Sequence, residues 1–154
     1  MYSYRNLINT LIAKKITVAI AESCTGGLLS TSFTSIPGVS KIFKIGLITY
    51  SNESKKLLLK IPLSKINKFG AVSEETAFLM VSNLSRISNC KLCISTTGIA
   101  GPSGGSKKKP IGLIYIGIKY KKKIIVFKKL FKGNRNKIQK DTTKYTLQLI
   151  KNLI

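Results

Sequence analysis

The sequence predicts a layered α/β domain with a mixed sheet, spanning residues 1–154 as a single unit. Short β-branched apolar runs alternate along the chain with amphipathic helical segments, a pattern typical of a sheet covered by helices. Near the end, two strand-like runs flank Lys121-Lys122-Lys123, which predicts a β-hairpin and therefore antiparallel pairing. A length of 154 residues suits one domain with a substantial core and is short for two.

The first half of the chain contains two predicted strands and three predicted helices. Residues 4–14 place apolar side chains at helical spacing and predict an amphipathic helix. Ile16–Ala21 is a nearly continuous apolar run, as expected of a strand buried on both faces. The elements expected next are a helix over 28–33 that ends at Ile36-Pro37-Gly38, a strand over 43–50 and a lysine-rich helix over 52–59.

The second half repeats this alternation and then closes with the hairpin. Over residues 70–75 a turn precedes a capping serine and two acids, which predicts a helix running to about Ser88. Leu92–Thr96 is a further short strand, and a glycine-rich loop over 97–105 follows it. The remaining expected elements are strands over 111–120 and 124–131 and a helix over 134–154.

The charge balance raises the hypothesis of a nucleic-acid partner. The chain carries 27 Lys and Arg against 5 Asp and Glu, a formal net charge of +22. Only three of the basic residues are arginines, however, although base recognition and bidentate phosphate contacts favour arginine. Lysine, isoleucine and asparagine are abundant together, which indicates a coding-composition bias. Most lysines are therefore expected on solvated faces, where they would attract phosphate-bearing ligands in a salt-dependent way.

Composition also excludes several classes of protein. The chain contains no apolar run of about 18 residues, so no transmembrane helix is expected, and Met1–Lys15 does not have the pattern of a secretory signal. Cys24, Cys90 and Cys93 are an odd number without paired metal-ligand spacing, so reduced thiols in a cytoplasmic protein are expected. The absence of histidine excludes Ser-His-Asp triads, Cys-His pairs and histidine-containing zinc sites. A serine nucleophile would then need another base, and lysine is the natural one.

Two candidate sites directly follow predicted strands, where ligand sites gather in open α/β sheets. Residues 22–27, Glu-Ser-Cys-Thr-Gly-Gly, turn a strand straight into a helix, and the backbone N–H groups there suit an oxyanion or a phosphate. A simple helix cap is the alternative. Residues 49–55 bring together a tyrosine, an asparagine, a carboxylate and Lys55, which lies one helical turn after Ser51. The alternative there is an ordinary surface lysine.

The third candidate is the loop over residues 97–105, which holds four glycines and a proline. It matches neither a P-loop nor a dinucleotide fingerprint, so it would either offer N–H groups to an anion or act as a solvated connector. The few carboxylates are expected to have specific tasks, such as pairing with a buried lysine or orienting a loop. A two-carboxylate acid/base mechanism and an all-carboxylate metal site remain open. The acids are Glu22, Glu53, Glu74, Glu75 and Asp141.

Four blocks of the chain carry a resemblance, and they are Ala21–Gly27, Gly46–Lys55, Gly70–Glu74 and Thr97–Gly105. Over about residues 5–150 the sequence resembles the CinA C-terminal domain, the nicotinamide-nucleotide amidohydrolase (PncC) family, in its stand-alone form. The resemblance implies a three-layer α/β/α fold with a mixed, mostly parallel sheet. It also implies a cytoplasmic enzyme of pyridine-nucleotide salvage that hydrolyses nicotinamide mononucleotide to nicotinate mononucleotide and ammonia. The family uses no metal or organic cofactor, and a homo-oligomer without membrane contact is expected.

The same resemblance assigns roles to individual residues. Ser23 would be the nucleophile and Lys55 its general base, with Tyr50 assisting, while N–H groups near Cys24 to Gly27 would stabilise the oxyanion. Arg135 would hold the phosphate, because a guanidinium offers planar bidentate hydrogen bonds. The substrate-binding residues that the resemblance implies are Glu22, Thr25, Gly26, Gly27, Asn52, Thr97, Gly98, Gly101, Gly105 and Arg135.

The chain departs from the family pattern at a few positions, none of which removes a proposed catalytic group. Gln139 stands where a second basic residue is common, which weakens the expected phosphate contacts of the last helix. The other departures are Ser54, Ser103, Lys107-Lys108 and Asn134. Two alternatives remain open. One is a binding module for nucleic acid or a phosphorylated partner that keeps the scaffold without turnover, and the other uses Cys24 as nucleophile, although no histidine is present to hold its thiolate.

Overall fold

A computed structural model describes residues 2–154, so that Met1, the first residue of the predicted domain, lies outside the described residues. The helices are α1 (Tyr2–Ala13), α2 (Leu28–Thr34), the short 3₁₀ helix η1 (Val39–Lys41), α3 (Asn52–Leu59), α4 (Leu63–Phe69), α5 (Glu74–Ser88) and α6 (Arg135–Leu153). The strands are β1 (Val18–Glu22), β2 (Phe43–Ile48), β3 (Leu92–Gly98), β4 (Leu113–Tyr120) and β5 (Lys123–Leu130).

The five strands form one mixed sheet in the order β2-β1-β3-β4-β5. β1 pairs in parallel with both β2 and β3, whereas β4 runs antiparallel to β3 and to β5. Four of the strands in the described sheet therefore point the same way, and β4 alone runs against them. The expected mixed, mostly parallel sheet and the hairpin before the last helix are both confirmed.

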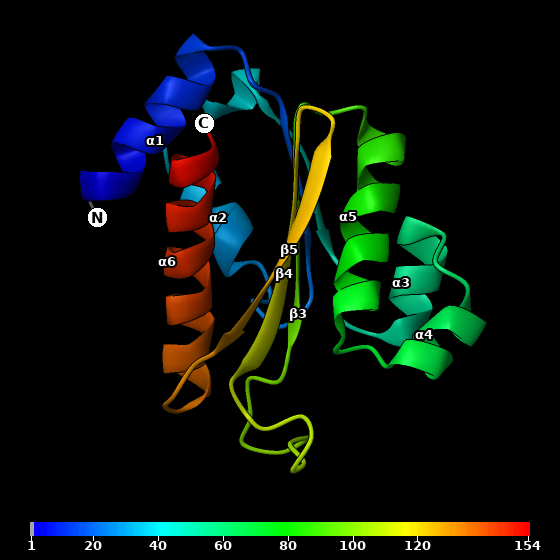
Figure 1. Cartoon of the computed structure of the whole chain (residues 1–154). Helices are drawn as coiled ribbons and strands as arrows, with labels where there is room; N and C mark the ends of the chain where they lie inside the picture. Colours follow the sequence, from blue (N-terminus) through cyan, green and yellow to red (C-terminus); the bar gives the residue numbers. More distant parts are fainter. Residues whose placement is uncertain (1) are drawn as a thin grey trace.

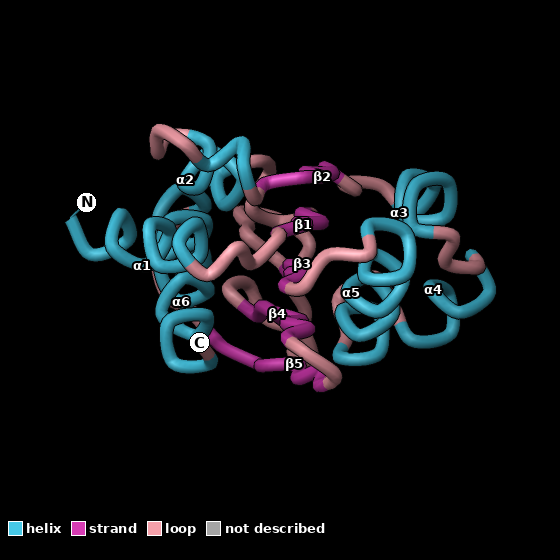
Figure 2. The backbone as a smooth tube through the Cα atoms, turned by 90° about the horizontal axis from the view of Figure 1, so that it is seen from above, coloured by secondary structure: helices cyan, strands magenta, loops and turns pink. Residues whose placement is uncertain are grey.

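Helices cover both faces of this sheet and produce three layers (Figures 1 and 2). α1, α2 and α6 lie on one face, and α3, α4 and α5 lie on the other. The side chains of β1 alternate between the two resulting cores, because successive residues of a strand point to opposite faces. Val18 and Ile20 pack towards α1, α2 and α6, whereas Ala19 and Ala21 pack towards α3, α4 and α5. All five residues of β1 are buried, as expected of a strand covered on both faces.

The structure differs from the sequence prediction mainly at element ends and in two short helices. The strand expected over 43–50 ends at Ile48, because Ser51 already caps the helix that follows. α4 and η1 were not predicted; α4 buries only one residue fully, Ile66, so its apolar pattern is weak. The capping serine predicted for the central helix is confirmed, since Ser73 accepts a hydrogen bond from the N–H of Thr76. Within residues 2–154, no helix combines the length and the apolarity that crossing a membrane requires.

Candidate active site

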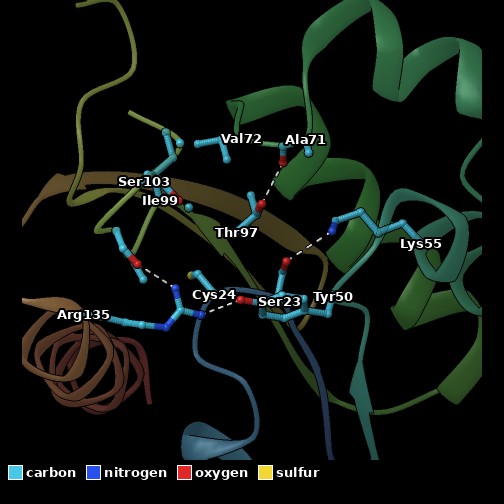
Figure 3. A pocket seen from close by; sticks show the side chains of 14 residues that line it. Ser23, Cys24, Tyr50, Lys55, Ala71, Val72, Thr97, Ile99, Ser103 and Arg135 are labelled. Atoms are coloured by element: carbon cyan, nitrogen blue, oxygen red, sulfur yellow. Dashed lines mark hydrogen bonds between the residues drawn. The ribbon is translucent and has the colours of Figure 1, made fainter. Parts of the chain in front are cut away.

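The carboxyl ends of three parallel strands meet at one edge of the sheet and open into a pocket of about 310 Å³. Ser23 directly follows β1, Tyr50 lies two residues after β2, and Thr97 lies near the end of β3. Figure 3 shows these side chains around the pocket, with Lys55 entering from α3 and Arg135 from α6. The structure thus brings together residues from all three candidate segments of the sequence.

The side chains of Ser23 and Lys55 meet at the base of the pocket. Lys55 Nζ lies 3.2 Å from Ser23 Oγ and 2.8 Å from the carbonyl oxygen of Thr49. Ser23 is 8% exposed and Lys55 is 1% exposed, so water has little access to either group. The carbonyl of Thr49 accepts one N–H of the amine and thereby fixes the direction of Nζ towards the serine.

The start of α3 explains why Lys55 reaches this position. Ser51 caps the helix, since its side chain accepts from the N–H of Ser54 at 3.0 Å and its own N–H donates to Ser54 Oγ at 3.0 Å. This reciprocal capping box satisfies two backbone donors and fixes where the helix begins. Lys55 then lies one turn into the helix and points back to the end of β2. Ser54, which departs from the family pattern, completes this capping box.

Burial lowers the pKa of Lys55, because removing the ammonium group from water disfavours its charged form. A smaller opposing influence comes from Cys24, whose negative charge when ionised would favour the ammonium. No carboxylate neutralises Lys55: the one ion pair among residues 2–154 joins Lys137 and Asp141 on α6. The site therefore favours a neutral amine, and a neutral amine is what a base for Ser23 must be.

Cys24 lines the same pocket but is a poor candidate for the nucleophile. Burial raises the pKa of its thiol to about 12, since the low-dielectric surroundings disfavour the thiolate. Hydrogen bonding from Thr96 and the charge of Lys55 act in the opposite direction but are outweighed. The three cysteines are all buried and unpaired, as predicted. No group of three or more Cys, Asp or Glu side chains gathers at one point in the described part of the chain.

The turn that carries Ser23 is tied to its surroundings at several points. The N–H of Ser23 donates to the carbonyl of Thr96 at 2.9 Å, and the hydroxyls of Thr25 and Thr96 lie 2.8 Å apart. Gln139 Nε2, from α6, donates to the carbonyl of Cys24 at 2.9 Å. No backbone oxygen in residues 2–154 accepts from the N–H groups of Cys24 or Thr25. Among the amides of residues 23–26 in the turn, these two are therefore the ones without a backbone partner.

Arg135 and Tyr50 close the other side of the pocket. Arg135 Nη1 donates to the carbonyl of Gly101 at 2.7 Å, and Nη2 donates to the hydroxyl of Tyr50. Both contacts are visible in Figure 3. The hydroxyl of Tyr50 thus contacts Arg135 and makes no hydrogen bond to Ser23 or Lys55, although it lines the same pocket. Its assisting role beside the catalytic pair stays a prediction. The Arg135 guanidinium still has N–H donors left for a ligand.

The glycine-rich loop lines the pocket because its backbone comes close to other strands. A Cβ on Gly98 would lie 2.6 Å from the carbonyl oxygen of Leu113, and Gly101 has a φ of +81°, which side chains rarely tolerate. The hydroxyl of Thr97 donates to the carbonyl of Ala71 at 2.7 Å. That bond brings the loop between α4 and α5 to the pocket wall.

The pocket contains seven of the predicted site residues and omits six. Those that line it are Ser23, Tyr50, Lys55, Thr97, Gly98, Gly101 and Arg135. Those that the structure places outside it are Glu22, Thr25, Gly26, Gly27, Asn52 and Gly105. The reasons are physical. The side chains of Glu22 and Thr25 are buried, Asn52 begins α3, and Gly26 and Gly27 lead into α2. A Cβ on Gly105 would lie 3.0 Å from the backbone nitrogen of Ile111, so that glycine serves close packing.

Several lining residues had no role in the sequence prediction. Ala71, Val72 and Ala100 give the pocket wall apolar surface, and they carry no chemical group that a single sequence would mark as functional. Ser103, noted only as a departure from the family pattern, also lines the pocket. The role of Gln139 in holding the turn was not predicted, since it depends on where α6 packs.

The fold and the pocket define a three-layer α/β/α domain with a buried serine–lysine pair at the carboxyl edge of its sheet. The model of the CinA C-terminal domain family matches residues 3–154. The chain is 42% identical over 145 residues to a competence-damage inducible protein of Thermoanaerobacter pseudethanolicus, covering 94% of this chain and 35% of that protein. It is 44% identical over 148 residues to a CinA-like protein of Petrotoga mobilis, covering 96% and 37%. The chain thus belongs to the CinA C-terminal domain family, and it spans about a third of the length of these curated relatives.

Solved structures agree with this assignment. The competence/damage inducible protein CihA of Agrobacterium tumefaciens superposes with a TM-score of 0.92 at 32% identity, covering 97% of this chain and 92% of that one. A CinA superfamily protein of Escherichia coli superposes with a TM-score of 0.93 at 24% identity, covering 98% and 88%. At 24% identity this second match supports the fold alone. The family resemblance expected from the sequence is confirmed.

Proposed function

We propose that the chain is a serine–lysine amidohydrolase that converts nicotinamide mononucleotide to nicotinate mononucleotide and ammonia. The observation that carries this proposal is the buried pair, with Lys55 Nζ 3.2 Å from Ser23 Oγ and no carboxylate paired with the lysine. A neutral amine at hydrogen-bonding distance from a serine hydroxyl is the arrangement that base-assisted nucleophilic attack requires.

The first half of the reaction forms an acyl-enzyme. Lys55 Nζ takes the proton of Ser23 as Oγ bonds to the carboxamide carbon, and the carbonyl oxygen becomes an oxyanion. The open N–H groups of Cys24 and Thr25 donate to that oxyanion. The Lys55 ammonium then gives its proton to the amide nitrogen as the C–N bond breaks, so that ammonia leaves and an ester remains on Ser23.

The second half releases the acid. Lys55, neutral again, takes a proton from a water molecule whose oxygen attacks the ester carbon. The ammonium returns this proton to Ser23 Oγ as the C–O bond of the ester breaks, and nicotinate mononucleotide is free to leave. The carbonyl of Thr49, 2.8 Å from Nζ, keeps the amine in one orientation through both halves.

The shape of the pocket supports a substrate with a phosphate at its far end. Ser23 and Lys55 lie at one side, while Arg135 lies at the other with unused N–H donors. A guanidinium matches the geometry of a phosphate, and its low hydration favours binding there. In this arrangement the carboxamide reaches Ser23 while the phosphate reaches Arg135, and the loop around Gly101 covers the ribose between them.

Purified protein incubated with nicotinamide mononucleotide tests the proposal. We expect ammonia and nicotinate mononucleotide in equal amounts, and a fall in kcat of about a thousandfold or more in Ser23→Ala and Lys55→Met. Lys56→Met is the matched control, because Lys56 is the exposed neighbour of Lys55 on the same helix. An active Lys55→Met variant would contradict the role of Lys55 as base. If Cys24→Ala were inactive while Ser23→Ala stayed active, the nucleophile would be the thiol of Cys24.

A further inference from the structure

Glu22 carries a carboxylate that is fully buried without a cationic partner. Its side chain is 0% exposed, and the only ion pair in residues 2–154 lies elsewhere, on α6. An isolated buried carboxylate is costly unless several donors satisfy it. In this site the donors are the N–H groups of Gly27 at 3.0 Å, Leu29 at 3.0 Å and Ser30 at 2.8 Å, together with the hydroxyl of Ser30 at 2.6 Å.

These four donors all belong to the start of α2. The residue in the capping position of that helix is Gly27, which has no side chain with which to cap it. The first N–H groups of a helix lack partners within the helix and carry partial positive charge. The Glu22 carboxylate, reaching across from the end of β1, supplies the missing acceptor and the complementary charge. The N-terminus of α2 is therefore already occupied by an anion of the chain itself.

This contact closes the Ser23 turn into a ring. Residue 22 ends β1, the turn runs over residues 23–27, and the N–H of Gly27 returns to the side chain of Glu22. On the strand side, the N–H of Ser23 is held by the carbonyl of Thr96. Both ends of the turn are thus anchored to the sheet, and the Ser23 hydroxyl and the open N–H groups lie between the two anchors.

We propose that Glu22 is a positioning residue, which sets the Ser23 turn and its oxyanion donors by binding the N-terminus of α2. The effect of Glu22 on kcat rests on the proposed function, whereas its effect on the conformation of the turn does not. Because all four partners are donors, the role needs a carboxylate: an amide would turn an NH₂ group towards some of them. Glu22→Gln keeps the size of the side chain and is therefore the sharpest variant.

The experiment compares Glu22→Gln with Phe33→Leu in the full chain. Phe33 is a buried residue of α2 outside the Glu22 contacts, so its variant reports ordinary loss of helix packing. We expect Glu22→Gln to speed hydrogen exchange of the amides in residues 24–30 well beyond Phe33→Leu at matched stability. We also expect it to slow labelling of Ser23 by a sulfonyl fluoride, and to lower kcat about a hundredfold with little change in KM.

The outcomes separate this inference from the proposed function. Equal exchange of residues 24–30 in the two variants would overturn the positioning role, whatever the activity. If Glu22→Gln loosens the turn and slows Ser23 labelling while wild-type protein leaves nicotinamide mononucleotide intact, the positioning role stands and the proposed substrate falls. Ser30→Ala removes one of the four hydrogen bonds and should give a smaller effect of the same kind; an effect as large as that of Glu22→Gln would contradict the role of the carboxylate.

Discussion

Lys55 differs from the other 23 lysines of the chain through its burial, which turns a common surface residue into a candidate base. Sequence spacing placed it one turn after Ser51 but could not show that its side chain would be enclosed. The enclosure comes from the capping box that sets α3 and from the carbonyl of Thr49, both of which depend on how β2 ends. The lowered pKa is a consequence of that local structure and can be tested directly.

The pKa of Lys55 should make stability depend on pH in a defined direction. Below its folded pKa the lysine is charged in both states and its burial costs free energy; above 10.5 it is neutral in both states and the cost is absent. The free energy of unfolding should therefore rise with pH between these two values. Urea unfolding of wild type and Lys55→Met across this range isolates the effect, because the variant keeps every other titrating group. A difference between the two proteins that does not change with pH would contradict the lowered pKa.

The same group should set the acid side of the activity profile. Below the pKa of Lys55, kcat/KM should fall about tenfold for each pH unit, since only the neutral amine accepts the Ser23 proton. The midpoint should lie below the ordinary lysine value of 10.5. A steady-state pH profile with nicotinamide mononucleotide measures it. A midpoint at or above 10.5 would show that Lys55 is not the titrating base.

Residue roles were predictable from the sequence where they follow a strand end and less so where they depend on packing. The segment over residues 22–27 was singled out because a strand turns there into a helix. The family resemblance then assigned the nucleophile to Ser23, and the pocket contains that residue. Glu22 was expected to bind substrate, yet its partners Leu29 and Ser30 belong to the next helix, whose direction no local pattern reveals. Tyr50 was expected beside the catalytic pair, and its contact with Arg135 depends on the packing of α6.

At the scale of elements, α6 links the two ends of the pocket. It begins at Arg135, and the side chain of Asn134 caps it by accepting from the N–H of Lys137 at 3.0 Å. Arg135 and Gln139 then stand one turn apart on the face that meets the pocket, and they contact Gly101 and Cys24 respectively. Gln139 stands where the family often has a basic residue. In this chain it holds the Ser23 turn by donating to the carbonyl of Cys24. In the proposed function, the phosphate contact expected of α6 therefore rests on Arg135.

Arg135→Lys should weaken binding of substrates that carry a phosphate. Lysine keeps the charge but lacks the planar guanidinium, so it cannot make the same bidentate hydrogen bonds to a phosphate. We expect the loss of these charge-assisted hydrogen bonds to raise KM about 10- to 100-fold. Steady-state kinetics with nicotinamide mononucleotide and with the riboside, which lacks the phosphate, measures the difference. Lys140→Met, an exposed change on the same helix, is the control. An equal effect of Arg135→Lys on both compounds would contradict a phosphate site at Arg135.

The alternation of strands and helices was sufficient to predict most elements, and α4 shows where such a prediction stops. Leu63–Phe69 is short, carries two lysines and buries Ile66 alone. Its apolar residues therefore form no periodic pattern by which a helix could be told from a loop. α5, in contrast, spans 15 residues with a regular apolar face and a capping serine, and the prediction matched it. Length and periodicity, more than composition, decided which helices could be predicted.

For the molecule as a whole, the excess of positive charge is spread over both helical layers. Exposed lysines lie on α3 and α4 of one layer, on α6 of the other and at the tip of the hairpin; examples are Lys56, Lys65, Lys144 and Lys122. This distribution agrees with solvated faces more than with one basic nucleic-acid surface. With a net charge of +22 and a single ion pair in residues 2–154, repulsion between like charges opposes the folded state.

Salt should therefore stabilise the protein. Raising the salt concentration from about 0.01 M to about 0.15 M shortens the screening length from about 30 Å to about 8 Å, which weakens repulsion between the lysines. We expect Tm to rise by at least about 2 °C, the shift that roughly 1 kcal/mol gives a domain of this size. Calorimetry in sodium chloride measures it, and a Tm that falls or stays constant would contradict net self-repulsion.

The proposed amidohydrolase activity depends on Ser23 forming an ester during turnover. The most direct test is acid quenching of the protein during the reaction with nicotinamide mononucleotide, followed by peptide mass analysis. The proposed mechanism predicts a nicotinoyl-nucleotide adduct on Ser23 in wild type and none in Ser23→Ala, together with loss of ammonia release in that variant. Turnover that continues in Ser23→Ala, or an adduct on Cys24 in place of Ser23, would contradict it.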